Sequence, residues 1–214
     1  MQATVLDRTV STVPGLIDRL RAETRDLHEA LERDLDWKNR MATLEGYRGL
    51  LARWWGFHAV FEPLVDARPP LPGLAGRRKL HLLERDLSRL GMFADAIRAL
   101  PRIDASSLPD DSAGMTGALY VLEGSTLGGL VIARHLRAAL AGTGAEDVCA
   151  YYQAYGRDRT GSMWRAFLNQ LSEEVSRASH QEVVAGARQT FSTLRLWLAQ
   201  DGLPVVAPPK APGT

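Results

Sequence analysis

Apolar residues recur every three or four positions along most of this chain, which is the spacing of one face of an α-helix. Leu16, Leu20, Leu27 and Leu31 show this spacing near the start of the sequence. Pro14 lies just before them, and proline is favoured in the first turn of a helix. We therefore predict a first helix that begins near Pro14. The alternating pattern of a half-buried strand is hard to find anywhere in the chain.

The same spacing predicts a series of further helices, separated by segments rich in proline, glycine and serine. Pro63 should kink or end the second helix, because proline interrupts the helical hydrogen bonds. Gly142 and Gly144 should end the longest one. We place these helices from Thr43 to about Pro63 and over about 75–90, 92–100, 112–140, 146–157, 160–178 and 180–200.

This pattern predicts one all-α domain of about seven or eight helices over residues 14–200. Leucine far outnumbers isoleucine, and leucine and arginine both favour helices over strands. We expect residues 1–13 to be a flexible N-terminus. The segment 201–214 is rich in proline and glycine, and we expect it to be a disordered tail.

Composition excludes several classes of protein. The 26 basic and 25 acidic residues leave a formal net charge of +1, which gives no support for nucleic-acid binding. Cys149 is the only cysteine, so an internal disulfide and cysteine-based zinc or iron–sulfur sites are excluded. The apolar run 117–136 contains Glu123 and Arg134, and we therefore expect no membrane span. The N-terminus has no secretory pattern, which predicts a cytoplasmic protein.

The five histidines do not form any common two-histidine metal motif. A di-iron bundle needs Glu-x-x-His on two helices, but no histidine here follows an acidic residue by three positions. The zinc motif HExxH is also missing, because its fifth position, counted from His28 as the first, is Glu32 and not histidine. Glycine-rich nucleotide motifs and the nucleophile motif GxSxG are absent from the sequence as well.

His28 has the most informative surroundings of these histidines. On a helical wheel, His28 lies about 100° from Leu27, at the edge of the apolar stripe, and Arg21, Glu32 and Arg25 follow at about 120° to 160°. An apolar wall, an imidazole and two guanidiniums in that order suit a flat ligand with a metal centre and carboxylate arms. The alternative is a boundary histidine hydrogen-bonded to Glu32, with the arginines exposed to solvent.

The segment 117–130, GALYVLEGSTLGGL, is unusually rich in glycine for the middle of a helix. Each interior glycine costs about 1 kcal/mol relative to alanine. Gly117, Gly124 and Gly128 fall within about 60° of each other on the helical wheel, so another group should come close to that backbone. This group is either a second helix, crossing at Gly124 and Gly128, or the plane of a ligand.

The two segments LRAETRDLHEALE and YVLEGSTLGGLVIARHL together resemble heme oxygenase. The similarity is greatest to the bacterial branch associated with bacteriophytochromes and extends over about residues 16–200. TGSMWRAFLNQL at 160–171 adds to the resemblance. It implies a single all-α bundle in which heme is sandwiched between a proximal and a distal helix.

On the proximal side, the resemblance implies that His28 is the iron ligand and that Glu32 lies beside this histidine. Arg21 and Arg25, seven and three positions before His28, match the basic residues that meet the heme propionates in the family. Arg165, in the segment MWRAF, matches a further propionate contact from a late helix.

On the distal side, the resemblance assigns Gly124, Gly128 and Gly129 to the glycines that lie over the open face of the iron. Phe191 matches an aromatic residue of the pocket. Many members carry aspartate after the first of these glycines, where it orders water that delivers protons. This chain has Ser125 there, which can hold a water but is not acidic.

The resemblance implies an enzyme that uses heme as both cofactor and substrate. It would open the porphyrin to biliverdin with O2, release iron and carbon monoxide, and supply the bilin to a bacteriophytochrome. The sequence has no flavin, nicotinamide or iron–sulfur motif, so electrons would come from an external donor such as a ferredoxin or a reductase. The alternative is a non-catalytic heme or tetrapyrrole carrier on the same fold, for which the missing aspartate is the main argument. A purely structural helical protein is the third hypothesis.

Overall fold

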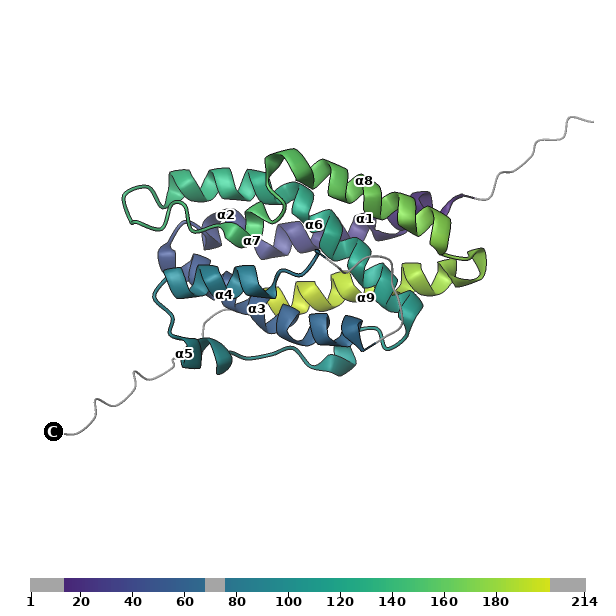
Figure 1. The fold of residues 1–214 in the computed structure, drawn as a ribbon, viewed down its shortest axis with the longest axis horizontal. Helices are drawn as coiled ribbons and strands as arrows, with labels where there is room; N and C mark the ends of the chain where they lie inside the picture. Colours follow the sequence, from purple (N-terminus) through teal and green to yellow (C-terminus); the bar gives the residue numbers. More distant parts are fainter. Residues whose placement is uncertain (1–13, 68–75, 201–214) are drawn as a thin grey trace, which may run out of the picture.

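The computed structural model describes residues 14–67 and 76–200, and within these ranges it confirms the all-α prediction (Figure 1). The predicted flexible N-terminus, the PPLPG segment at 69–73 and the predicted tail lie outside the described residues. The elements are α1 (Leu16–Leu35), α2 (Trp37–Arg40), α3 (Leu44–Asp66), α4 (Leu80–Arg89), α5 (Ala94–Arg98), η1 (Ala105–Ser107), α6 (Ser112–Ala139), α7 (Ala150–Gln153), α8 (Arg157–Glu174), η2 (Arg177–Ser179) and α9 (His180–Leu198).

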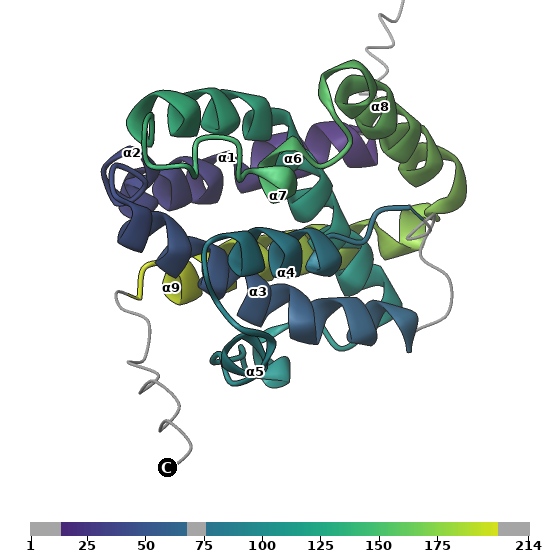
Figure 2. The same ribbon diagram turned by 60° about the vertical axis from the view of Figure 1, so that its left-hand side comes forward.

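Helix α9 is the helix on which both α6 and α1 pack most closely. The crossing of α6 and α9 is built from glycines: a Cβ at Gly117 or at Gly186 would lie less than 3.0 Å from the backbone of the opposite helix. In Figure 2, α6 bends part-way along its length, so that its second half runs beside α1. Large side chains such as Tyr47, Phe57 and Phe167 are fully buried and fill the core between these helices.

The ends of the long helices follow the local sequence closely. Thr43 caps α3, since its side chain accepts a hydrogen bond from the Gly46 N–H, and Asp111 caps α6 in the same way. The predicted interruption at Pro63 is wrong by one turn, because α3 continues to Asp66 with proline inside its last turn. Proline removes one backbone hydrogen bond from the helix, and only one further turn of α3 follows it.

The helix predicted over 146–157 is the largest difference from expectation. Only Ala150–Gln153 is helical, and the chain then turns through Gly156, which has a φ of 79°, into α8. The buried carboxylate of Asp86 accepts hydrogen bonds from the N–H groups of Ala150 and Tyr151 at 3.0 and 2.8 Å. A short helix that is held by a side chain from α4 carries no periodic signal in its own sequence.

Helix α6 is long and apolar enough, by length and composition alone, to cross a membrane. However, 61% of its most apolar stretch is buried inside the protein. Its hydrophobicity is therefore accounted for by packing against α9, α7 and α8.

Candidate functional site

Helices α1 and α6 run side by side in the same direction but barely contact each other, while each packs on α9 (Figures 1 and 2). They approach one another at two levels. Near the start of α1, Arg21 lies close enough to Tyr120 to act on its pKa: burial raises that pKa, and the charge of Arg21 opposes part of the rise. Beyond the end of α1, Trp37 contacts His135 edge-on, with 5.2 Å between ring centroids. His28 and Leu127 each lie seven residues further along their helix than Arg21 and Tyr120, a rise of about 10 Å on both helices, and we infer from this that the two residues lie at a similar level.

The imidazole of His28 is the group on α1 best placed to bind a ligand between these helices. Its side chain is 53% exposed, and Nε2 lies 3.7 Å from Glu32 Oε1, which is too long for a hydrogen bond. The predicted alternative, a boundary histidine hydrogen-bonded to Glu32, is therefore not formed. Phe191 of α9 contacts the imidazole edge-on, with 5.6 Å between ring centroids. The imidazole ring is thus supported by α9 and has no hydrogen-bond partner among the described residues.

The glycines of α6 divide into two groups. Gly117 lies against the backbone of α9, and a Cβ at Gly129 would lie within 3.0 Å of the Tyr152 carbonyl oxygen that precedes the end of α7. Gly128 has open space where its side chain would be, and a Cβ at Gly124 would touch only the Trp164 ring, at 3.6 Å. The helix crossing that we considered at Gly124 and Gly128 is therefore wrong. Packing between helices explains Gly117 and Gly129 but leaves Gly128 unexplained.

Exposed apolar side chains lie beside Gly124 and Gly128, the two glycines that no neighbouring backbone covers. Leu127 is 46% exposed and Val131 is 57% exposed, and both fall within about 60° of Gly124 on the wheel of α6. This part of the helix therefore offers bare backbone between apolar side chains. Such a surface suits a flat apolar ligand that comes close to the helix.

Three arginines near this region have no ion pair or hydrogen bond to any described residue: Arg21, Arg25 and Arg165. All three are exposed. Arg19, which lies on α1 with Arg21 and Arg25, instead pairs with Glu23 at 2.8 Å. The guanidinium of Arg165 folds back over Gly161, since a Cβ there would lie 3.5 Å from its Nη1. Unpaired guanidiniums at the rim of an apolar site are suited to bind carboxylates of a ligand.

Ser125 is exposed, and its Oγ donates a hydrogen bond of 2.8 Å to the Leu122 carbonyl of its own helix. It also lines a cavity of about 60 Å³ that reaches behind α6 to Lys79 and Tyr152. The Tyr152 hydroxyl is buried and has no hydrogen-bond partner among the described residues. A cavity of this size with such polar groups has room for ordered water.

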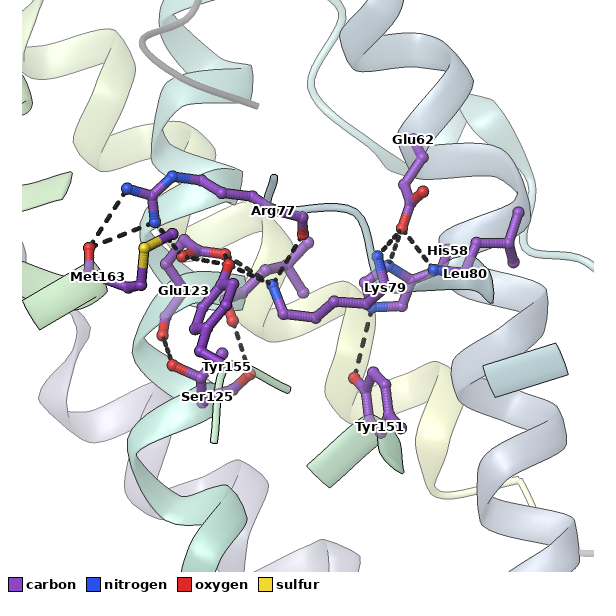
Figure 3. A network of polar contacts seen from close by, with 12 residues as sticks. His58, Glu62, Arg77, Lys79, Leu80, Glu123, Ser125, Tyr151, Tyr155 and Met163 are labelled. Atoms are coloured by element: carbon purple, nitrogen blue, oxygen red, sulfur yellow. Dashed lines mark hydrogen bonds and ion pairs between the residues drawn. The ribbon is translucent and has the colours of Figure 1, made fainter. Parts of the chain in front are cut away.

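His58 is placed quite differently from His28. It is buried in α3, where its Nδ1 lies 3.0 Å from Glu62 Oε1 and its Nε2 lies 3.4 Å from the Tyr151 hydroxyl (Figure 3). Burial lowers the pKa of His58, so the ring is neutral at pH 7 and both nitrogens are occupied by protein partners. Its aromatic surroundings therefore belong to the core. The described residues hold no cluster of three or more His, Cys, Asp or Glu that suits a metal ion.

The sequence analysis missed a buried cluster of charges behind α6. Glu123 pairs there with Arg77 and Lys79, which come from the segment before α4 (Figure 3). A signal was present, because Glu123 lies within a run of buried apolar residues. A buried carboxylate needs partners, but its sequence position does not show which residues supply them.

Known proteins show which family this chain belongs to. Residues 15–200 match the family model of heme oxygenase. The chain belongs to the heme oxygenase family. Over 129 residues it is 36% identical to a heme oxygenase of Xanthomonas campestris pv. campestris (strain 8004), covering 60% of this chain and 72% of that protein.

Two solved heme oxygenase structures share this fold. The enzyme from Leptospira interrogans has a TM-score of 0.68 at 15% identity and covers 87% of this chain and 99% of its own. The enzyme from Neisseria meningitidis, solved with NO and CO bound, has a TM-score of 0.66 at 24% identity and covers 92% and 100%. Family and fold together support an enzyme that binds and degrades heme. Enzymes of this family generally take electrons from a reductase.

The residues of the α1–α6 region fit such a substrate. Heme needs an imidazole for its iron, an apolar slot for its faces and cations for its two carboxylates. His28 has no hydrogen-bond partner among the described residues, Gly128 opens to empty space, and three guanidiniums are unpaired within the described chain.

Proposed function

We propose that the chain binds heme between α1 and α6, with His28 as the proximal iron ligand, and converts it to biliverdin with release of iron and carbon monoxide. The observation that carries this proposal is the exposed imidazole of His28, which has no hydrogen-bond partner among the described residues; the empty space beside Gly128 on α6 supports it. Bound heme supplies the site at which O2 is activated. Electrons come from an external donor such as a ferredoxin or a reductase.

On the proximal side, the residues of α1 and its neighbours orient the substrate. Glu32 Oε1 lies 3.7 Å from Nε2 of His28, so this carboxylate would orient the imidazole that binds the iron. Phe191 supports the ring from α9. Arg21 and Arg25, together with Arg165 of α8, bind the propionates, since these guanidiniums are exposed and carry no other partner among the described residues.

On the distal side, Gly124 and Gly128 let the macrocycle approach the α6 backbone, because a side chain at either position would project into that space. Gly129 supports them by allowing α7 to pack closely on α6. Ser125 lines the cavity behind α6 and would hold water there for proton delivery to the distal side of bound heme.

The resemblance to the branch associated with bacteriophytochromes supports a further step. We propose that the enzyme works in the cytoplasm and that a bacteriophytochrome receives the biliverdin. We also propose that residues 14–200 form the catalytic domain and that the segments 1–13 and 201–214 lie outside it. The family match over 15–200 supports this domain boundary.

The test is a titration of the purified chain with ferric heme, followed by addition of reductant and oxygen. One equivalent of heme should give the spectrum of a histidine-ligated complex. Turnover should give biliverdin, and its isomers can be separated by chromatography. A spectrum unchanged from that of free heme would refute heme binding. A stable complex that yields no biliverdin under reductant and oxygen would refute catalysis and leave a heme carrier.

A further inference from the structure

A buried cluster of charges lies on the far side of the residues that we assign to the distal face. Glu123, which directly precedes Gly124, is 1% exposed. Its Oε1 accepts a 2.6 Å hydrogen bond from Lys79, its Oε2 pairs with Arg77, and the Tyr155 hydroxyl lies 2.9 Å from both oxygens (Figure 3). The carboxylate therefore has a partner on each oxygen, and its position is determined from two sides.

Lys79 is equally committed to this cluster. Its ammonium has three N–H donors, and three acceptors surround it: Glu123 Oε1, the Arg77 carbonyl at 3.2 Å and the Tyr155 hydroxyl at 3.4 Å. Its backbone N–H donates to Glu62 of α3 at 2.8 Å, as does the N–H of Leu80 at 2.9 Å. Lys79 thus joins α3, the start of α4 and α6, and it keeps no proton donor free for chemistry.

Arg77 extends the cluster to α8. Both of its Nη atoms lie close to the Met163 carbonyl, at 3.4 and 3.3 Å, while Nη1 also pairs with Glu123. Met163 is followed by Trp164, the ring that lies against Gly124, and then by Arg165. One guanidinium therefore links the part of α6 that carries the distal glycines to the part of α8 that carries a propionate arginine. The planar guanidinium offers two Nη groups, so it can pair with Glu123 and still reach the Met163 carbonyl with its second Nη.

Stability alone is a weak reason for such an arrangement. Removing two cations and a carboxylate from water is costly, and a buried ion pair often contributes no more than an apolar pair of the same volume. The cluster does provide a defined register, since α6 cannot slide along α8 without breaking a charged contact. Lys79 and Arg77 are balanced by Glu123 and Glu62, so the group is neutral while His58 is uncharged.

We propose that Arg77, Lys79 and Glu123 are positioning residues that hold the distal glycines of α6 in register with Arg165 on α8. This register determines how heme is rotated in its site and hence which edge of the macrocycle is opened. The inference rests on the proposed function, because it assigns the cluster a role only toward bound heme.

The test is Arg77→Lys. This variant keeps the positive charge that pairs with Glu123 but loses the guanidinium group that reaches the Met163 carbonyl. The matched control is Arg78→Lys: its neighbour Arg78 is exposed and pairs only with Asp66 among the described residues. The first readout is the set of heme-methyl proton NMR shifts of the ferric complex, which reports heme rotation before any turnover. The second is the biliverdin isomer ratio.

Arg77→Lys should keep heme affinity and helix content but change the population of heme orientations by about 2-fold to 10-fold, the factor that one lost hydrogen bond is worth. In the heme-free protein, amide exchange should become faster in both 124–128 and 163–167. Arg78→Lys should leave all of these as in the wild type. Wild-type NMR shifts and isomer ratio in Arg77→Lys would overturn the inference.

Lys79→Met serves if Arg77→Lys does not fold, since it leaves the pair between Arg77 and Glu123 intact. Because it frees Glu123 on the side of α3 and α4 while the link through Arg77 remains, it should shift the heme orientations less than Arg77→Lys does, and wild-type shifts would overturn the inference here too. A wild-type chain that binds no heme would refute the proposed function itself. Normal heme conversion with unaltered Arg77→Lys and Lys79→Met spectra would refute only the role of the cluster.

Discussion

Gly128 and Gly129 are adjacent on α6, yet alanine should have opposite effects at the two positions. Nothing lies within 4 Å of a Cβ at Gly128, whereas a Cβ at Gly129 would lie less than 3.0 Å from the carbonyl oxygen of Tyr152. In the heme-free protein, Gly128→Ala gains helix propensity without any clash. The gain is about 1 kcal/mol, which raises Tm by about 2–4 °C in a protein of this size.

For heme binding the expectation at Gly128 is reversed. If the macrocycle lies against this backbone, the added methyl group enters occupied space, and overpacking of this kind costs about 1–3 kcal/mol. Heme affinity should therefore fall by about 5-fold to 150-fold while the protein itself becomes more stable. Gly129→Ala should lower Tm instead, because the backbone of α7 cannot yield as a flexible side chain can.

Thermal unfolding of the heme-free variants and titration with ferric heme measure the two effects separately. Gly49→Ala is the control, since Gly49 lies within α3, also with nothing within 4 Å of its Cβ. It should raise Tm as Gly128→Ala does and leave heme affinity unchanged. A lower Tm for Gly128→Ala would show that protein already fills that space. A higher Tm with wild-type heme affinity would show that no ligand approaches Gly128.

Three further predictions test the other residues. His28→Ala should lose the spectrum of histidine-ligated heme and nearly all turnover, with partial recovery in added imidazole; an unchanged spectrum would mean that another group binds the iron. Arg165→Glu should change the chromatographic ratio of biliverdin isomers more than heme affinity, because an exposed ion pair contributes less than about 1 kcal/mol, and an unaltered ratio would contradict the propionate contact. Burial holds the pKa of His58 below its usual 6.5, so only the unfolded chain takes up this proton as the pH falls through 6.5. Stability from this group is therefore lost toward acid at up to about 1.4 kcal/mol per pH unit. His58→Gln should flatten the fall of Tm between pH 7 and pH 5, and an equally steep fall would rule out His58 as its source.

Helical spacing was sufficient to predict the elements that bury their own apolar stripe. The start of α1 and both ends of α3, α6 and α9 were placed within about three residues of those observed, whereas α8 begins three residues earlier and ends four residues earlier than predicted. The caps of α3 and α6 are local sequence signals. Helix α7 was not predicted at its true length, because Asp86 of α4 holds its first turn from 64 residues away. No pattern within 146–157 contains that information.

The glycines of α6 show the same limit at the candidate site. A wheel places Gly117 with Gly124 and Gly128 on one face, but α6 meets different neighbours at different levels along its axis. At Gly117 the neighbour is α9, and at Gly128 no protein atom comes near. Two glycines at similar angles on the helical wheel thus have different roles: Gly117 allows close helix packing, and Gly128 leaves part of α6 uncovered. Periodicity predicts which residues share a face, but only the tertiary structure shows which part of that face the protein covers. Gly128 lies in the uncovered part, so substitution of this glycine distinguishes a ligand site from a helix contact.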